Sequence, residues 1–375
     1  SKPISNFNSR ITFTGQKADI KESTLKLGDT QLHLSAAIER FSPLTLSYNL
    51  STPEIRPADF EASLPADRQT AVLKNLSSEG SLRMQNGQAT FQGKVVSGEG
   101  ILYGIGYQGL DTTLALADKV LRIRNIKFNA LKGAIQAEGE YAFSDVPRFS
   151  LASQLSGIDL PELYGYFNAQ NQRDVRGRLN GNLKITGQGN DWHAIKTNLR
   201  GQGHAEVMQG ALLNVNIADA VLSGATGMSG LANLINPTVR KKYPETFEAK
   251  DTEFKELRTE LEAADGRINF KNLHMVAAQF TVDGNGWADF DRAVDFRATV
   301  QFSPPLSSDI AGAARELKFL FNKENELEIP FTLAGTLPRV KPKPDTAYLA
   351  KALQRGFFQR GADELQKQFS GSKDA

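Results

Sequence analysis

The stretch TLKLGDTQLHLSA, residues Thr24–Ala36, shows the pattern that decides the fold. Leucines alternate with polar residues on both sides of a Gly28-Asp29 turn. A period of two places successive side chains on opposite faces of a strand. The stretch therefore predicts a β-hairpin with one apolar face and one wet face.

The same alternation runs along the whole chain. It is clear in RITFTG (Arg10–Gly15) and in LTLSYNL (Leu44–Leu50). Turn-forming pairs separate the alternating runs, among them Ser42-Pro43, Asn86-Gly87, Val146-Pro147 and Asp265-Gly266. Such punctuation predicts a succession of antiparallel hairpins.

The chain contains three segments of roughly 50 residues that share one order of alternating strands and turns. They begin at Ile11, Thr113 and Thr259, and such repetition is typical of repeated supersecondary units. After the last strand of each segment the chain reads RPADF, DLPEL or PLSSDI, which predicts a short helix. We therefore expect one continuous sheet over residues 1–344, built from units of approximately 1–65, 76–168 and 176–344.

Helical periodicity is confined to a few places. It predicts helices over residues 216–235 and over Asp309–Phe321, the latter with Asp309 as the N-cap. Residues 345–375 form an expected amphipathic helix and tail after a Pro-containing linker. Its apolar stripe is expected to cap the groove or to contact a membrane, and consists of Leu349, Leu353, Phe357, Leu365 and Phe369.

Composition excludes several classes of function. Lys and Arg number 44 against 42 Asp and Glu, so no strong positive field attracts nucleic acid. The absence of cysteine excludes thiol catalysis and disulfides. No apolar run is long enough for a membrane helix. Since the chain starts Ser1-Lys2-Pro3, we expect a piece of a longer protein, with any membrane anchor outside it.

The alternation creates more apolar strand surface than three or four weak helices can cover. Alternation alone leaves two interpretations open: a closed sandwich or barrel with a dry core, or an open, curled sheet whose trough binds lipid chains. Each CH₂ removed from water contributes ~0.8 kcal/mol, so a trough could hold acyl chains without any catalytic residue. The expected lining residues are Ile11, Phe13, Leu25, Leu27, Leu114, Leu116, Ile123, Phe128, Phe270, Met275, Phe280, Phe296, Phe331 and Leu333.

Other signals are weaker than they look. Gly104–Gly109 matches the G-x-G-x-x-G dinucleotide fingerprint, but its flanks alternate as strands and no helix follows. The acidic run DFDRAVD (289–295) lacks the Gly and distal Glu of a calcium loop. The four histidines lie far apart. We therefore predict no catalytic residue, no metal site and no cofactor.

Three segments between Leu199 and Pro344 resemble the C-terminal region of AsmA-family proteins. The residues that carry this resemblance are Gly201, Gly203, Gly210, Leu212 and Ile217, then Thr252, Phe254, Leu257, Gly266, Leu273, Val282, Gly284 and Gly286, then Pro330, Gly335, Thr336, Leu337 and Pro342. The closing segment departs from the family pattern, which usually has one more turn residue before the first proline, here Pro338.

The resemblance favours the open sheet. It implies a mainly β fold: a long, twisted and curled antiparallel sheet that forms a groove of the bridge-like lipid-transfer type, with few short helices. It further implies a periplasmic location in a Gram-negative bacterium, an inner-membrane anchor outside this chain, and phospholipid moving between the inner and outer membranes. It implies no catalytic residue.

Two alternatives remain open. The chain could be a scaffold that pairs its sheet edge with strands of outer-membrane or periplasmic proteins. A polysaccharide-cleaving enzyme is the other alternative and ranks last. Such an enzyme needs carboxylates clustered on one face, whereas the acidic residues of this chain are scattered at turns.

Overall fold

The computed structural model describes residues 4–28, 30–56, 71–102, 104–167, 174–225, 237–313, 315–337 and 340–355. It contains two compact units: unit 1 holds residues 1–171 and 179–203, and unit 2 holds residues 172–178 and 204–375. Over the described residues the protein is mainly β, with antiparallel strands in an open sheet that does not close into a barrel, and with a few short helices. The predicted fold class is confirmed. The division into three repeat units stays a prediction.

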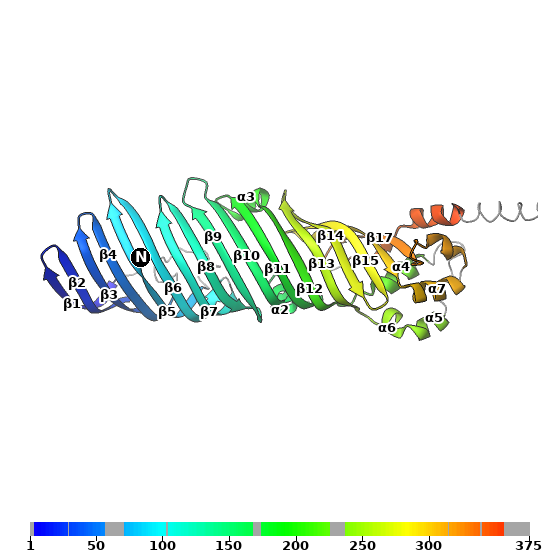
Figure 1. Cartoon of the computed structure of the whole chain (residues 1–375), viewed down its shortest axis with the longest axis horizontal. Coiled ribbons are helices and arrows are strands. Elements are labelled where there is room, and N and C mark those ends of the chain that lie inside the picture. Colours follow the sequence, from blue (N-terminus) through cyan, green and yellow to red (C-terminus); the bar gives the residue numbers. More distant parts are fainter. Residues whose placement is uncertain are drawn as a thin grey trace, which may run out of the picture. The chain divides into compact units, whose positions relative to one another are not determined.

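Unit 1 is a meander in which each strand from β1 to β10 hydrogen-bonds to the next strand in the sequence (Figure 1). Its strands are β1 (Ile4–Thr14), β2 (Lys17–Leu27), β3 (Thr30–Phe41), β4 (Leu44–Ile55), β5 (Val72–Gln85), β6 (Gln88–Leu102), β7 (Ile105–Ala117), β8 (Val120–Ala130), β9 (Gly133–Ala142) and β10 (Arg148–Asp159). Helix α2 (Leu160–Phe167) and helix α3 (Trp192–Asn198) also belong to unit 1, while strands β11 (Val175–Gln188) and β12 (Arg200–Leu212) each contain residues of both units.

Unit 2 combines a smaller meander with most of the helices. Its strands are β13 (Thr252–Ala264), β14 (Arg267–Ala277), β15 (Phe280–Asp289), β16 (Ala293–Phe302), β17 (Glu328–Thr336) and β18 (Lys343–Pro344). Its helices are α4 (Ile217–Ala225), α5 (Pro237–Lys242), α6 (Pro244–Phe247), α7 (Pro304–Ala313), a 3-10 turn over Arg315–Leu320, and a helix over residues 346–355.

The predicted hairpin turns at Ser42-Pro43, Asn86-Gly87, Val146-Pro147 and Asp265-Gly266 are present, whereas Asp29 of the Gly28-Asp29 turn lies outside the described residues. At Asn86-Gly87 the two φ angles are +51° and +75°, and at Asp265-Gly266 they are +53° and +72°. Positive φ at both central residues characterises the type I′ turn, whose twist matches that of the flanking strands. Asn, Asp and Gly tolerate this conformation better than other residues do, which is why these dipeptides were informative.

A left-handed Asn recurs where strands bend, within the motif apolar–basic–Asn–apolar. In β8 Asn125 has φ +55°, and the pairing with β9 shifts register there. Across the ladder the Thr112 hydroxyl donates to the Arg124 carbonyl, 3.1 Å away, so the interrupted ladder does not leave that acceptor unpaired. The arrangement repeats at Asn75, where Ser97 bonds the Lys74 carbonyl (2.8 Å), and at Asn272, where Thr259 bonds the Lys271 carbonyl (3.0 Å).

Short helices follow the repeats where the structure describes them. Helix α2 begins in DLPEL, and Asp159 Oδ1 accepts a hydrogen bond from the Glu162 amide (3.1 Å). Helix α7 covers PLSSDI but begins at Pro304, so the prediction of Asp309 as its N-cap was wrong. Proline fits the first helical turn because its φ is already helical and its missing amide is not needed there.

Another helical prediction is met in part. Within 216–235 the structure places α4, and the remainder, 226–235, lies outside the described residues. The third capping sequence, RPADF, lies outside them from residue 57 onward.

The left-handed Asn generates a prediction about stability. Asn125→Val is expected to lower the free energy of unfolding by roughly 1–2 kcal/mol, because a β-branched residue fits φ +55° poorly. Asn125→Gly should be neutral or stabilising at this backbone conformation. Urea unfolding followed by far-UV circular dichroism would measure both, with Asn129→Val in the same strand as the control. Equal effects of Asn125→Val and Asn129→Val would contradict the account.

Candidate functional site

The candidate site is one face of the sheet in unit 1. Directly paired residues of adjacent strands lie on the same face of a sheet. Following the pairing from Phe13 across β1–β10 gives a row with no polar side chain apart from the tyrosine hydroxyl: Phe13, Ala18, Ile38, Leu46, Leu82, Phe91, Leu116, Leu121, Tyr141 and Phe149.

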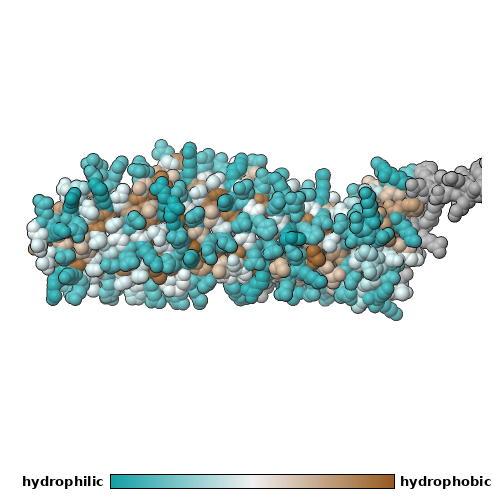
Figure 2. Space-filling model, in the orientation of Figure 1, coloured by the Kyte–Doolittle hydropathy of each residue, from teal (hydrophilic) through white to brown (hydrophobic). Residues whose placement is uncertain are grey.

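The neighbouring rows define two faces. The next row on the same face again has no charged residue: Ile11, Ile20, Ala36, Tyr48, Gly80, Gly93, Leu114, Ile123, Gly139 and Leu151. The row between them, which points the other way, is largely hydrophilic: Thr12, Asp19, Ala37, Ser47, Ser81, Gln92, Ala115, Arg122, Glu140 and Ser150. We call these the apolar face and the polar face of unit 1. Hydrophobic surface shows between hydrophilic side chains over these strands (Figure 2).

Aromatic rings lie against glycines of neighbouring strands on this face. A Cβ atom at Gly93 would lie 2.6 Å from the Tyr48 hydroxyl, and one at Gly100 would lie 2.6 Å from the Tyr107 hydroxyl. No side chain larger than glycine fits beneath these rings. The glycines therefore let these aromatic side chains come close to the backbone of the sheet.

Unit 2 has an apolar face of the same kind. One row across β13–β17 is Leu261, Phe270, Gly286, Phe296 and Leu333. The rings of Phe270 and Phe296 are 5.3 Å apart, and a Cβ at Gly286 would lie 2.3 Å from the Phe296 ring. This packing gives a physical reason for Gly286 in the family-like G-x-G segment.

The register places all fourteen expected lining residues on the apolar face of their own unit. In unit 1, Ile11 and Phe13 are exposed and Leu27 is buried, while Leu25, Leu114, Leu116, Ile123 and Phe128 are half-buried. In unit 2, Met275, Phe280 and Phe331 are buried, while Phe270, Phe296 and Leu333 are half-buried. The four buried residues belong to the protein's own core. Contact of the other ten with lipid stays a prediction.

The helices of unit 2 explain why part of its apolar face is buried. Val300, Phe302 and Ile329 have no exposed surface, and neither do Leu222, Leu306, Ile310 and Leu349 of the helices. Thr252, one of the family-like positions, joins α4 to β13: its hydroxyl accepts from the Ile217 amide (2.9 Å) and donates to the Val215 carbonyl (2.7 Å). This half of the unit is an ordinary closed core.

Asp309 joins two of these helices instead of starting one. Its Oδ2 accepts hydrogen bonds from Lys242 Nζ and from the Tyr243 hydroxyl, both at 2.6 Å. The bond from Lys242, followed by that from Tyr243, holds the pKa of Asp309 below its usual range. The carboxylate thus stays ionised while it links α5 to α7.

The tail helix begins where the sequence predicts. Asp345 Oδ1 accepts a hydrogen bond from the Tyr348 amide at 2.9 Å, which makes Asp345 the N-cap. Leu349 and Leu353 of the expected stripe are buried. Phe357, Leu365 and Phe369 lie outside the described residues.

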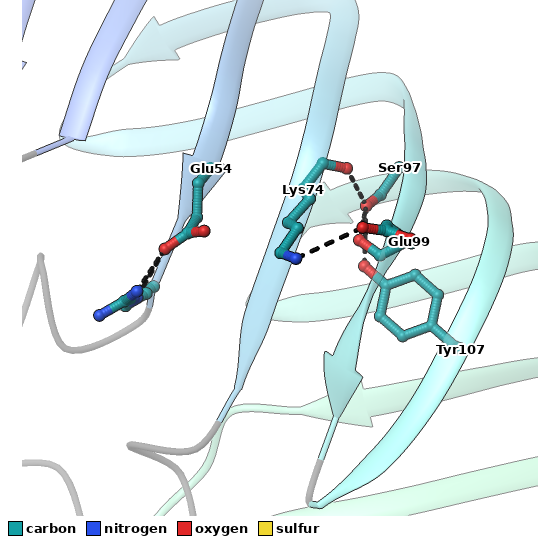
Figure 3. Close-up of polar contacts among 6 residues, drawn as sticks. Glu54, Lys74, Ser97, Glu99 and Tyr107 are labelled. Atoms are coloured by element: carbon teal, nitrogen blue, oxygen red, sulfur yellow. Dashed lines mark hydrogen bonds and ion pairs between the residues drawn. The ribbon is translucent and has the colours of Figure 1, made fainter.

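A polar contact is built into the apolar face beside the Asn75 bend (Figure 3). Ser97 Oγ lies 2.8 Å from the Lys74 carbonyl and 2.8 Å from the Tyr107 hydroxyl, and both side chains are buried. Burial raises the pKa of Tyr107, so the phenol stays neutral. The sequence analysis did not predict the hydrogen bond between Ser97 and Tyr107. The available signal was a serine next to a run of alternating apolar residues.

Three shallow hollows in unit 1 have volumes of about 680, 1010 and 650 Å³. The first is lined mainly by rows of the polar face, including His33, Glu79 and Lys94. The other two also have mixed, largely polar linings. None of them is the apolar face itself.

The described residues hold no group of three or more His, Asp or Glu side chains placed to bind a metal. Gly106 and Gly109 of the dinucleotide-like motif lie within strand β7, and the next element is strand β8. Among the described helices, none is both long enough and apolar enough to cross a membrane.

Comparison with known proteins supplies one match. A sequence model described as the AsmA family matches residues 51–273, more than half of the chain. The match extends into the earlier strands, where the family-like residues were sparse, and stops before the closing segment around Pro330. Searches of curated proteins and of solved structures give no significant match.

The buried phenol generates a pH prediction. The unfolded chain releases a tyrosine proton near pH 10, whereas folded Tyr107 holds its proton to a higher pH. Stability that Tyr107 contributes below about pH 10 is therefore lost as the pH rises through its raised pKa. Urea midpoints from pH 8 to 11 should fall less steeply for Tyr107→Phe than for wild type. Tyr141→Phe, at an exposed tyrosine, is the control and should leave the slope unchanged.

Proposed function

Because the chain belongs to the AsmA family, we propose that the apolar face of unit 1 binds the acyl chains of phospholipids and conducts them through the periplasm. The family is associated with outer-membrane assembly and lipid transport, and its proteins are generally associated with the cell envelope. The finer statements are our proposal: phospholipid as cargo, the periplasm of a Gram-negative bacterium as location, and an inner-membrane anchor outside this chain.

The observation that carries the proposal is the unbroken apolar row across β1–β10. At ~4.8 Å between strands, ten strands give a path of roughly 43 Å, which exceeds the ~30 Å hydrocarbon core of a bilayer. A 16-carbon chain on such a path gains on the order of 10 kcal/mol relative to water. Such a gain lowers the barrier to moving lipid through an aqueous space.

The protein acts in this proposal without catalysis. Transport along the face needs continuity and exposure of apolar side chains, and no bond is made or broken. The polar side chains in and near the face, such as Ser97 and Tyr107, bond one another and the backbone. Their role is to hold the strands.

A scaffold function is the second candidate, and one observation favours it. Strand β1 pairs with β2, and its side chains Phe7, Ile11 and Phe13 are all exposed. A partner strand added at this edge would cover them by β-augmentation. Edge pairing predicts that function survives a charge placed on the apolar face far from β1.

The lipid proposal is tested by placing the same charge on opposite faces of strand β7. Leu114→Glu puts a charge on the apolar face, and Ala115→Glu puts the same charge on the polar face beside Arg122. Wild type and Ala115→Glu should retain phospholipid, seen by mass spectrometry of organic extracts, whereas Leu114→Glu should lose roughly tenfold, because acyl chains avoid a charged site. Wild-type protein that binds no lipid, or equal lipid in both variants, would count against the proposal.

A further inference from the structure

The two long rims of the apolar face of unit 1 differ in exposure. One rim is formed by the ends of strands at β2–β3, β4, β6–β7, β8–β9 and β10, and we call it the far rim. Five apolar residues along it are 9% exposed or less: Leu27, Ile55, Tyr107, Ala130 and Ile158. They form packed clusters, for example Leu27 with Leu32, Ile55 and Leu76. The far rim is closed by its own side chains.

The opposite rim is formed by the hairpin turns β1–β2, β3–β4, β5–β6, β7–β8 and β9–β10, and we call it the hairpin rim. Large apolar side chains near these turns are 44–69% exposed: Phe13, Phe41, Met84, Phe143 and Val146. Trp192 at the start of α3 is exposed as well, and α3 lies beside the β9–β10 turn, joined to it by the bond from Asn190 Nδ2 to the Asp145 carbonyl (3.1 Å) (Figure 1).

Basic residues accompany the exposed apolar residues of the hairpin rim. Arg40 precedes Phe41 and Arg83 precedes Met84. The Phe143 amide donates to the carbonyl of Lys119 in the β7–β8 turn, 2.8 Å away. Acidic residues are also present: Glu39 is paired with Lys17 at 2.6 Å, Asp118 adjoins Lys119 in the β7–β8 turn, and Asp145 lies in the β9–β10 turn. Aromatic and aliphatic side chains flanked by Arg and Lys are the pattern of surfaces that sit at a membrane–water interface.

We propose that the hairpin rim of unit 1 docks on a phospholipid bilayer and that acyl chains pass over it sideways onto the apolar face. The inference rests on the proposed function, which it extends by assigning the place of entry and exit. Phe13 and Tyr141 belong both to the exposed rim and to the apolar row. An acyl chain that crosses there stays in contact with apolar side chains throughout.

The far rim offers no such route, because a chain entering there would have to separate packed side chains. Basic residues on the hairpin rim complement lipid phosphates, which distinguishes a bilayer from an uncharged apolar partner. We therefore expect faster docking on anionic bilayers than on zwitterionic ones.

The test places the same charge at the hairpin rim and at the opposite strand ends. Phe41→Glu and Phe143→Glu alter the hairpin rim, and Ile101→Glu alters an exposed apolar residue that lies at the opposite end of β6, on the polar face. Transfer of a fluorescent phospholipid is measured between donor and acceptor vesicles of phosphatidylcholine with and without phosphatidylglycerol. Lipid carried by each purified variant is measured in parallel, and far-UV circular dichroism checks folding.

We expect the hairpin-rim variants to transfer roughly tenfold more slowly while still carrying lipid, since a large apolar side chain no longer enters the bilayer. Ile101→Glu should transfer at the wild-type rate, and phosphatidylglycerol should speed transfer by wild type. Wild type that carries and transfers no lipid would overturn the proposed function itself. If wild type transfers lipid but Ile101→Glu slows transfer as much as the hairpin-rim variants do, or if no variant slows it, the assignment of the hairpin rim as the docking surface would be overturned while the proposed function would stand. Sedimentation showing that wild type dimerises and the hairpin-rim variants do not would assign the rim to a contact between copies and overturn bilayer docking.

Discussion

Strand register is the constraint on which the rest of this structure depends. Side chains alternate between faces, so a slip by one residue in any strand would replace an apolar side chain with its hydrophilic neighbour. Ten successive strands keep the row from Phe13 to Phe149 apolar, which requires nine pairings in register. The left-handed Asn residues extend the apolar face along the strands beyond this row. At Asn125 the strand gains a residue, and the next apolar side chain, Ile126, returns to the same face.

The sequence was sufficient to predict which face of the sheet a side chain lies on, but not how deeply that side chain is buried. Alternation alone was enough to put Phe280 and Phe296 on one face, since that needs only local period and the correct turns. It could not tell that Phe280 is buried and Phe296 half-buried, because burial depends on which part of a strand the helices of unit 2 cover.

The bends were missed although a signal existed, in the repeated motif apolar–basic–Asn–apolar at residues 73–76, 123–126 and 270–273. Asp309 was misplaced because an acidic residue before an apolar run looks like an N-cap, while the two prolines that start α7 lie five and four residues earlier. A residue's partners across space, here Lys242 and Tyr243, leave no local trace in the sequence.

The two units use the same kind of face in different ways. In unit 2, the apolar ends of β15–β17 and the helices bury one another's side chains, so the unit has a core of ordinary character. In unit 1, most of the apolar rows are half-buried, and the described helices α2 and α3 lie at strand ends (Figure 1). Half-burial in unit 1 comes from neighbours on the same sheet, which can cover the sides of a side chain but leave its top open.

An open apolar face in water is unfavourable, and the protein limits the unfavourable exposure without covering the face by a second layer. Backbone groups inside the meander pair strand to strand, and at Asn75 and Asn125 the Ser97 and Thr112 hydroxyls bond carbonyls where the ladder is interrupted, so the exposed surface contains side chains and little unsatisfied backbone. Aromatic side chains lie directly against Gly93, Gly100 and Gly286 of the sheet. Complete closure would need a second layer, and a second layer would cover the continuous apolar row across the strands that a long, flexible apolar ligand can use. An acyl chain is such a ligand: it bends with the sheet, has no polar group along its length, and covers the tops of the side chains that their own neighbours leave open.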